Sequence, residues 1–91
     1  MSYQLIFTAQ YMRRAEKFLK RHPNLQQQYL KTLQLLELNP HHPSLRLHAL
    51  SGRLSALHAV SINLSYSITL ELLITDQEIT PINVGDHDAV Y

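Results

Sequence analysis

The hydrophobic side chains of this chain change their spacing near residue 45, and this change limits the folds that are open to it. Before residue 40 they recur every three or four positions, as they do on one face of an α-helix. From Leu45 onward they alternate with polar residues, which is the period of a β-strand with one buried face. Because helical and strand segments are separated along the chain, the pattern predicts an α+β fold, with the helices on one face of an antiparallel sheet.

Two helices are expected before residue 40. Thr8 can cap the first, since a threonine oxygen accepts from the unpaired N–H groups of a first turn, and Pro23 ends that helix. Asn24 can cap the second helix, with Gln27 three residues later as in a capping box. Helices joined by so short a corner form an antiparallel hairpin. Residues 3–7, rich in aromatic and branched side chains, predict a short strand before both helices.

Four further strands are expected after the helices, at residues 45–50, 57–62, 65–74 and 78–84. The alternation in 65–74 predicts an outward face of Ser67, Thr69 and Glu71, and an inward face of Tyr66, Ile68, Leu70, Leu72 and Ile74. The inward residues should pack against Phe18, Leu19, Leu30 and Leu33 of the helices. Pro81 cannot donate to a sheet ladder and demands an edge or a bulge. The predicted order is β-α-α-β-β-β-β, in a single domain that spans residues 1–91.

Charge is distributed unevenly, although the formal net charge is only +1. All eight Lys and Arg lie in residues 1–53 with two of the acids, and the other five acids lie in residues 54–91. The first helix carries a basic cluster of Arg13, Arg14, Lys17, Lys20 and Arg21. Such a cluster attracts phosphate groups or an acidic partner, or it is simply a solvated helix face.

The composition excludes several kinds of site and location. Without cysteine, the chain can form neither disulfides nor thiolate metal sites. No apolar stretch approaches the ~20 residues that a membrane helix needs, and the N-terminus offers no signal peptide. We therefore expect a cytoplasmic protein that makes no membrane contact.

Residues 85–91, Gly-Asp-His-Asp-Ala-Val-Tyr, follow the last expected strand, where a fold can display a site. They supply His87 between two aspartates that can orient its ring or cap a turn. A second histidine, His48, lies beside Arg46 on the polar face of an earlier strand. Two imidazoles that titrate near neutrality can act as base and acid without a metal or cofactor, while a cation stabilises a phosphorane. This set is sufficient to cleave RNA, whose 2′-OH is the nucleophile.

Several histidines have simpler interpretations. The alternative to a catalytic His48 is a histidine that is simply solvated on the polar face of its strand. His58 shares a strand face with Val60 and Ile62, which favours a packed structural histidine. The His-His pair at residues 41–42 lies between two prolines without acidic or thiolate companions, so we expect a loop there and no metal site.

Three sequence segments together resemble the RelE/ParE superfamily of bacterial toxins from type II toxin–antitoxin pairs. They are residues 13–19 (Arg-Arg-Ala-Glu-Lys-Phe-Leu), residues 43–48 (Pro-Ser-Leu-Arg-Leu-His) and the closing residues 85–91. Residues 61–66 are similar as well, and the most similar branch is the YafQ-type messenger-RNA interferases. The resemblance spans nearly the whole chain and implies the RelE-like microbial ribonuclease fold. It also implies cleavage of mRNA in the ribosomal A site, with a DNA-binding antitoxin as partner, so that DNA is contacted only through the antitoxin.

The resemblance implies roles for particular residues. His87 is expected to act as acid or base, with His48 as its counterpart. Arg46 or Arg53 would contact the phosphate, and Tyr91 would stack on a nucleobase or orient the phosphate. The uneven charge predicts that the antitoxin places an acidic helix on the basic N-terminal half or in the groove beside the sheet.

Ser67 departs from the family, in which arginine often follows the tyrosine of the third strand. We expect it to border the site without supplying positive charge, and Ser51 and Ser61 also stand where family members often carry basic residues. Loss of one cation that stabilises transition-state charge removes roughly 10²–10³ in rate. The chain is therefore expected to be a weakened or an inactive ribonuclease. The alternatives are a ParE-like inhibitor of DNA gyrase with no hydrolytic site, and an interaction module unrelated to toxins.

Overall fold

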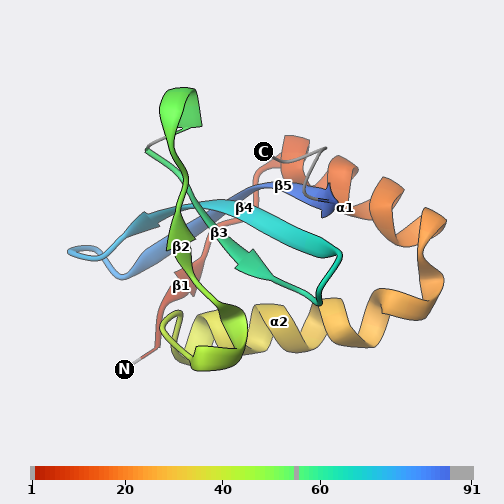
Figure 1. Ribbon diagram of the computed structural model, residues 1–91, viewed down its shortest axis with the longest axis horizontal. Helices are drawn as coiled ribbons and strands as arrows, with labels where there is room; N and C mark the ends of the chain where they lie inside the picture. Colours follow the sequence, from red (N-terminus) through yellow and green to blue (C-terminus); the bar gives the residue numbers. More distant parts are fainter. Residues whose placement is uncertain (1, 55, 87–91) are drawn as a thin grey trace.

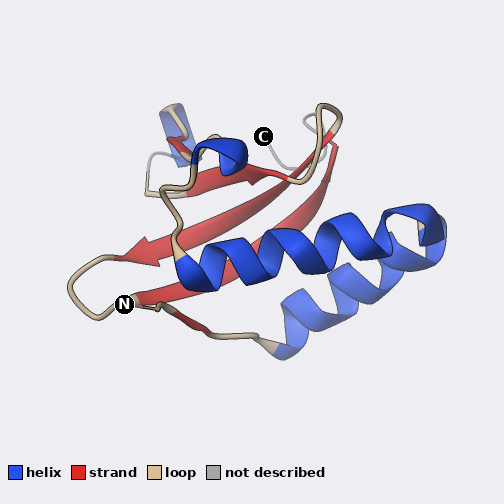
Figure 2. Cartoon of the chain, turned by 90° about the horizontal axis from the view of Figure 1, so that it is seen from below, coloured by secondary structure: helices blue, strands red, loops and turns tan. Residues whose placement is uncertain are grey.

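The computed structural model describes residues 2–54 and 56–86. Its helices are α1 (Ala9–Arg21) and α2 (Gln26–Leu38), and its strands are β1 (Gln4–Leu5), β2 (His48–Ala49), β3 (His58–Ser61), β4 (Tyr66–Leu73) and β5 (Glu78–Asp86). Short 3-10 turns lie at η1 (Pro23–Leu25), η2 (Pro43–Leu45) and η3 (Gly52–Leu54). The strands form one sheet in the order β1-β5-β4-β3-β2 (Figure 1). Both helices lie on the same face of this sheet (Figure 2). No helix in the described residues is long and apolar enough to span a bilayer.

The predicted α+β class and element order are confirmed. One strand pairing differs from the expected antiparallel sheet, because β1 runs parallel to β5, with Gln4 opposite Glu78. The other pairings, β2 with β3, β3 with β4, and β4 with β5, are antiparallel. The sheet is therefore mixed. Side-chain alternation indicates which residues share a face, but it carries no information on the direction of the neighbouring strand.

The two helices begin differently. The predicted cap of α1 is confirmed, since the Thr8 hydroxyl accepts a 3.1 Å hydrogen bond from the Tyr11 amide. The predicted capping box at Asn24 is wrong, because residues 23–25 form η1 and α2 begins only at Gln26. The Leu25 amide donates to the His22 carbonyl at 2.9 Å, which closes this corner and buries Leu25. The corner needs a tighter turn than an α-helix provides.

The alternation in β4 predicted only part of the burial. Ile68 is buried on the helix-facing side, as expected. Ser67 and Thr69, predicted to face outward, are also buried, and Ser67 has 0% of its surface exposed. Ile74, predicted to be buried, is 61% exposed because β4 ends one residue earlier. Leu30, expected beneath the sheet, lies on the exposed side of α2 and is 48% exposed.

Pro81 lies at an irregularity of the sheet, which confirms the expected bulge. β5 is an interior strand between β1 and β4, so the edge alternative does not apply. Pro81 stands opposite Leu70, where the pairing register shifts between Thr69 and Leu70. The shift accommodates a residue that has no amide proton to donate.

A pair of tyrosines joins the two helices in the core. The hydroxyls of Tyr11 on α1 and Tyr29 on α2 share a buried 2.7 Å hydrogen bond. Burial raises the pKa of Tyr11 far above its ordinary value, and the charge and hydrogen bond of Tyr29 raise it further. Burial also raises the pKa of Tyr29, although its hydrogen bond to Tyr11 acts in the opposite direction.

Folding stability should fall as the pH rises above about 10, where the unfolded chain releases the Tyr11 proton and the folded chain keeps it. Because the folded-state pKa of Tyr11 is raised, its contribution is complete below the unfolded pKa and is lost above it. The expected slope is about 1.4 kcal/mol per pH unit for this tyrosine. Urea unfolding followed by circular dichroism between about pH 9 and about pH 11 measures it. Tyr11→Phe should show a shallower slope, and equal slopes for both proteins would contradict the assignment.

Candidate functional site

The face of the sheet opposite the helices carries two of the predicted site residues. Directly paired residues point to the same side of a sheet. One row across the strands runs from His48 through Ala59 and Thr69 to Asn83. The next row contains Ser61, Ser67 and Gly85. His48 and Ser67 therefore share this face, and strand spacing and rise place their Cα atoms about 12 Å apart.

The His48 ring is oriented by the backbone of Arg46. Its Nδ1 lies 2.9 Å from the Arg46 carbonyl oxygen. Because a carbonyl only accepts, Nδ1 carries the proton in this contact, and the lone pair of the neutral ring is on Nε2. His48 is exposed. An exposed imidazole held in this tautomer has the form required of a general base.

Arg46 occupies an unusual backbone conformation directly after η2. Its φ of 52° lies in the left-handed region, which non-glycine residues seldom adopt. Leu45 is buried and anchors the turn, and the Arg46 amide donates to the Pro43 carbonyl at 3.2 Å. This turn directs the Arg46 carbonyl at His48 and places the Arg46 side chain along a hollow of about 220 Å³ beside residues 61–64. One turn thus positions both residues.

Arg53 lies in η3, at the opposite end of β2 from η2 (Figure 1). η3 projects from the sheet and begins at Gly52, whose φ of 66° suits a residue without a side chain. The two predicted phosphate contacts, Arg46 and Arg53, therefore lie beyond the two ends of β2. His87, Asp88 and Tyr91 lie outside the described residues, so their expected positions stay predictions. β5 ends at Asp86, which pairs with Tyr66.

Two other histidines have structural surroundings. His58 pairs with Leu70 on the helix-facing side of the sheet and is half-buried, which supports its interpretation as a packed residue. Its buried Nδ1 has no hydrogen-bond partner among the described residues. His42 caps η2, since its Nδ1 accepts from the Ser44 amide at 3.2 Å and lies 2.8 Å from the Ser44 hydroxyl. Within residues 2–54 and 56–86, no three His, Asp or Glu side chains form a group that could hold a metal ion.

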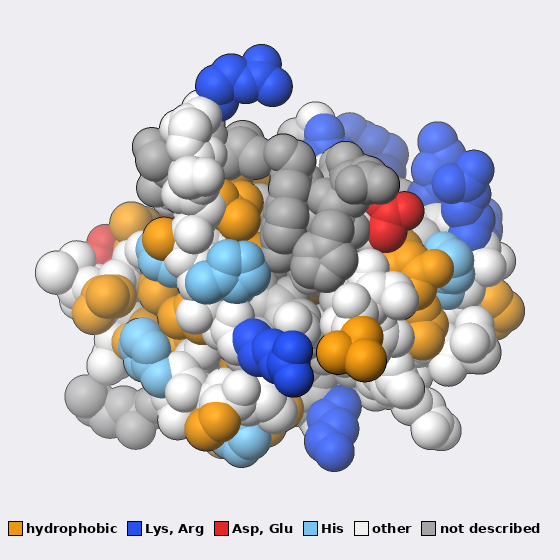
Figure 3. Space-filling model, viewed as in Figure 1, with side chains coloured by type: hydrophobic (Ala, Val, Ile, Leu, Met, Phe, Trp, Pro, Cys, Tyr) orange, Lys and Arg blue, Asp and Glu red, His pale blue; other side chains and the backbone are white. Residues whose placement is uncertain are grey.

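The residues that line a cleft between α1 and the sheet were not predicted from the sequence. This cleft measures about 320 Å³ and is lined from α1 by Arg14, Lys17, Phe18, Arg21 and His22, and from the strands by Tyr66 and residues 83–86. Its three cations share one face of α1, because their spacing of three and four residues follows the helical period. That spacing is visible in the sequence, but the strand ends that complete the cleft are remote from it. Lys and Arg side chains gather over α1 on this side of the molecule (Figure 3).

Three rings and one fixed arginine give this cleft a defined shape. The His22 ring lies 4.9 Å from that of Phe18 and 4.8 Å from that of Tyr66, and the Phe18 and Tyr66 rings are 5.4 Å apart. The Arg14 guanidinium donates to the Ile82 carbonyl at 2.9 Å and so ties α1 to β5. The cleft ends at Gly85 and Asp86, directly before the predicted catalytic His87.

Comparison with known proteins identifies the fold. No sequence model of a protein family matches the chain, and no curated protein matches it either. Among solved structures, YafQ from E. coli strain BL21(DE3) superimposes with a TM-score of 0.71 and 18% identity over 98% of each chain. The E. coli DinJ–YafQ toxin–antitoxin complex matches with a TM-score of 0.72 and 20% identity, over 100% of this chain and 99% of that chain. A YoeB/ParE toxin from Agrobacterium tumefaciens gives a TM-score of 0.74 at 12% identity, over 92% and 98%. The chain therefore has the expected RelE-like fold, which these toxins share.

Proposed function

We propose that this chain is the toxin of a type II toxin–antitoxin pair and that it cleaves mRNA on the ribosome. The observation that carries the proposal is His48, an exposed residue held by the Arg46 carbonyl on the sheet face opposite the helices, in a fold that YafQ toxins share. An oriented imidazole beside an arginine is suited to phosphate ester chemistry at RNA. Cytoplasmic mRNA bound to the ribosome is the substrate in this proposal.

The proposed reaction needs one base, one acid and positive charge. His48 Nε2 takes the proton of a ribose 2′-OH, and the resulting oxygen attacks the adjacent phosphorus. The bond from phosphorus to the 5′-oxygen breaks, and His87 protonates that leaving oxygen. The products are a 2′,3′-cyclic phosphate and a free 5′-OH. Arg46 and Arg53 stabilise the phosphorane charge, and Tyr91 stacks on a neighbouring base.

Ser67 limits the rate in this proposal. A buried serine supplies no positive charge at a position on the same sheet face as His48. One missing cation of this kind costs roughly 10²–10³ in rate, so we propose slow cleavage. Replacing Ser67 with arginine would set a charged side chain at a fully buried position, and such a change also costs folding stability.

The partner in this proposal is a cognate antitoxin with an acidic helix. The DinJ–YafQ complex supports it, because that toxin of the same fold was crystallised with its antitoxin. Arg13 and Lys20, which lie on α1 outside the cleft, offer a complementary surface for acidic side chains, which would speed and orient the encounter. The toxin would meet DNA only through this partner.

Primer extension on mRNA translated in a purified system tests the proposal. The chain should produce cleavages that require the ribosome, that leave a 2′,3′-cyclic phosphate, and that stop when the antitoxin is added. The same preparation is assayed for inhibition of supercoiling by DNA gyrase. Gyrase inhibition without any mRNA cleavage would replace this proposal with the ParE-like function, for which Ser67 is the favouring observation.

A further inference from the structure

The cleft between α1 and the ends of β4 and β5 has features that the proposed cleavage does not use. We propose that it binds single-stranded RNA, with phosphates on Lys17 and Arg21 and one base stacked on the rings of His22 and Tyr66. The inference rests on the proposed function in taking RNA as the ligand. It adds a binding site formed by side chains other than the proposed catalytic residues.

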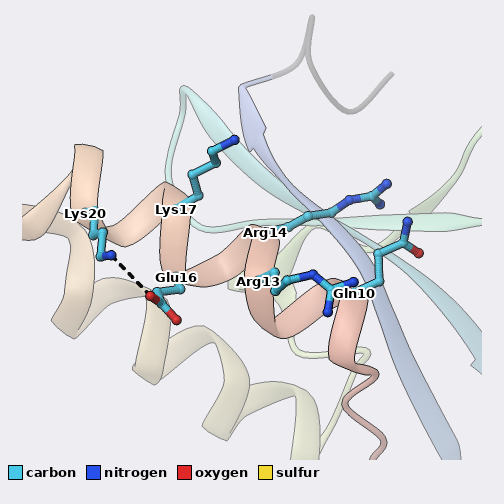
Figure 4. A pocket seen from close by; sticks show the side chains of 6 residues that line it. All are labelled: Gln10, Arg13, Arg14, Glu16, Lys17 and Lys20. Atoms are coloured by element: carbon cyan, nitrogen blue, oxygen red, sulfur yellow. Dashed lines mark ion pairs between the residues drawn. The ribbon is translucent and has the colours of Figure 1, made fainter.

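The cations of the cleft are arranged for a nucleic-acid backbone. Lys17 and Arg21 are exposed and lie one turn apart on α1, about 6 Å along its axis, which suits two successive phosphates. Among the described residues, neither takes part in an ion pair, whereas Lys20 is paired with Glu16 at 3.2 Å. In Figure 4, Arg14 and Lys17 extend toward the strands, while Lys20 extends toward Glu16. Within the described part of the chain, Lys17 and Arg21 therefore have no carboxylate partner that a bound phosphate would have to displace.

The rings of the cleft provide a surface for a base. Phe18 is buried and supports the other two rings from below. His22 and Tyr66 are half-buried and line the cleft, so part of each ring surface faces the ligand space. Stacking of a base on such a surface tolerates any sequence, because every base has a π-face.

These features favour RNA over an acidic peptide. An acidic peptide would use the cations but would gain nothing from the ring surface. A strand of RNA carries a phosphate and a base in every residue, so it can use the cations and the ring surface together.

Fluorescence anisotropy away from the ribosome tests this inference with three probes of equal length. They are an RNA hexanucleotide, an abasic sugar-phosphate hexamer and a hexaglutamate peptide. The RNA should bind about tenfold more tightly than the abasic backbone, because of stacking. Lys17→Gln and Arg21→Gln should each weaken RNA binding and lower the slope of log K against log salt by about 0.7. Tyr66→Leu, or His22→Ala if that variant folds poorly, should remove the difference between RNA and the abasic backbone.

Matched controls come from the same helix. Lys20→Gln and Arg13→Gln make the same charge changes outside the cleft, and they should leave the affinity and the salt slope nearly unchanged. Equal losses for Lys17→Gln and Lys20→Gln would overturn the inference in favour of a diffuse attraction. Hexaglutamate binding as tightly as RNA would overturn it in favour of an acidic protein partner. A chain that binds RNA here but cleaves no mRNA on the ribosome would remove the proposed activity and leave this site standing.

Discussion

His48→Ala should lower the rate of ribosome-dependent mRNA cleavage by about 10²–10⁴, the usual contribution of a positioned acid–base group. The imidazole is held by the Arg46 carbonyl, so the substitution removes an oriented proton acceptor. Because His48 is exposed, the free energy of unfolding should stay within about 0.5 kcal/mol of its original value. Cleavage rates from primer extension and unfolding curves in urea measure the two quantities separately.

Two further variants make this result specific. His48→Gln keeps a polar side chain but cannot transfer a proton near neutrality, and it should be as slow as His48→Ala. His41→Ala removes another exposed histidine and should cleave at the original rate. Cleavage by His48→Ala within a few-fold of the original would show that His48 is the solvated side chain of the alternative interpretation.

Leu70→Ala should lower the free energy of unfolding by about 2–5 kcal/mol, because it leaves a cavity between the sheet and the helices. Leu70 has no exposed surface and belongs to the core cluster that joins β4 to α1 and α2. The substitution removes apolar contacts at a position where the register shift already constrains the backbone. Equilibrium unfolding in urea, followed by circular dichroism, gives the difference.

Leu64→Ala is the matched control, because it makes the same chemical change at a leucine that is 81% exposed. Its effect should stay within about 0.5 kcal/mol. Similar losses for the two variants would mean that the core does not lie between β4 and the helices. A loss at Leu70 alone would support the packing of the sheet against the hairpin.

The spacing of side chains predicted the helices and strands well, but it predicted the burial of residues and the pairing of strands less well. Local signals were sufficient for the Thr8 cap and for the bulge at Pro81, because each depends on the chemistry of one residue. The burial of Ser67 was not predictable in this way, since alternation assigns a residue to a face without indicating whether that face is covered. The parallel pairing of β1 depends on where the hairpin returns the chain, which no short window of sequence contains.

For the candidate site too, the residue types were predictable from the sequence and their arrangement was not. His48 and Arg46 were identified from the sequence as neighbouring residues of suitable type. The hydrogen bond between the His48 ring and the Arg46 carbonyl, however, depends on the left-handed backbone conformation of Arg46. Arginine is not a residue that signals such a turn, so the orientation of His48 followed only from the fold. The cleft on α1 likewise needed the strand ends that face it, which follow the helix by more than forty positions.

The pairing of β1 with β5 also determines the order in which the molecule can assemble. Gln4 meets Glu78 across nearly the whole length of the described chain, so this contact closes a very long loop and is intrinsically slow to form. During synthesis, β1 and α1 leave the ribosome first and cannot make their contacts with β5 until that strand has emerged. Arg14 can reach the Ile82 carbonyl only when that strand has emerged and docked. The cleft on α1 is therefore completed late, and a nascent chain cannot hold RNA there until β5 is in place.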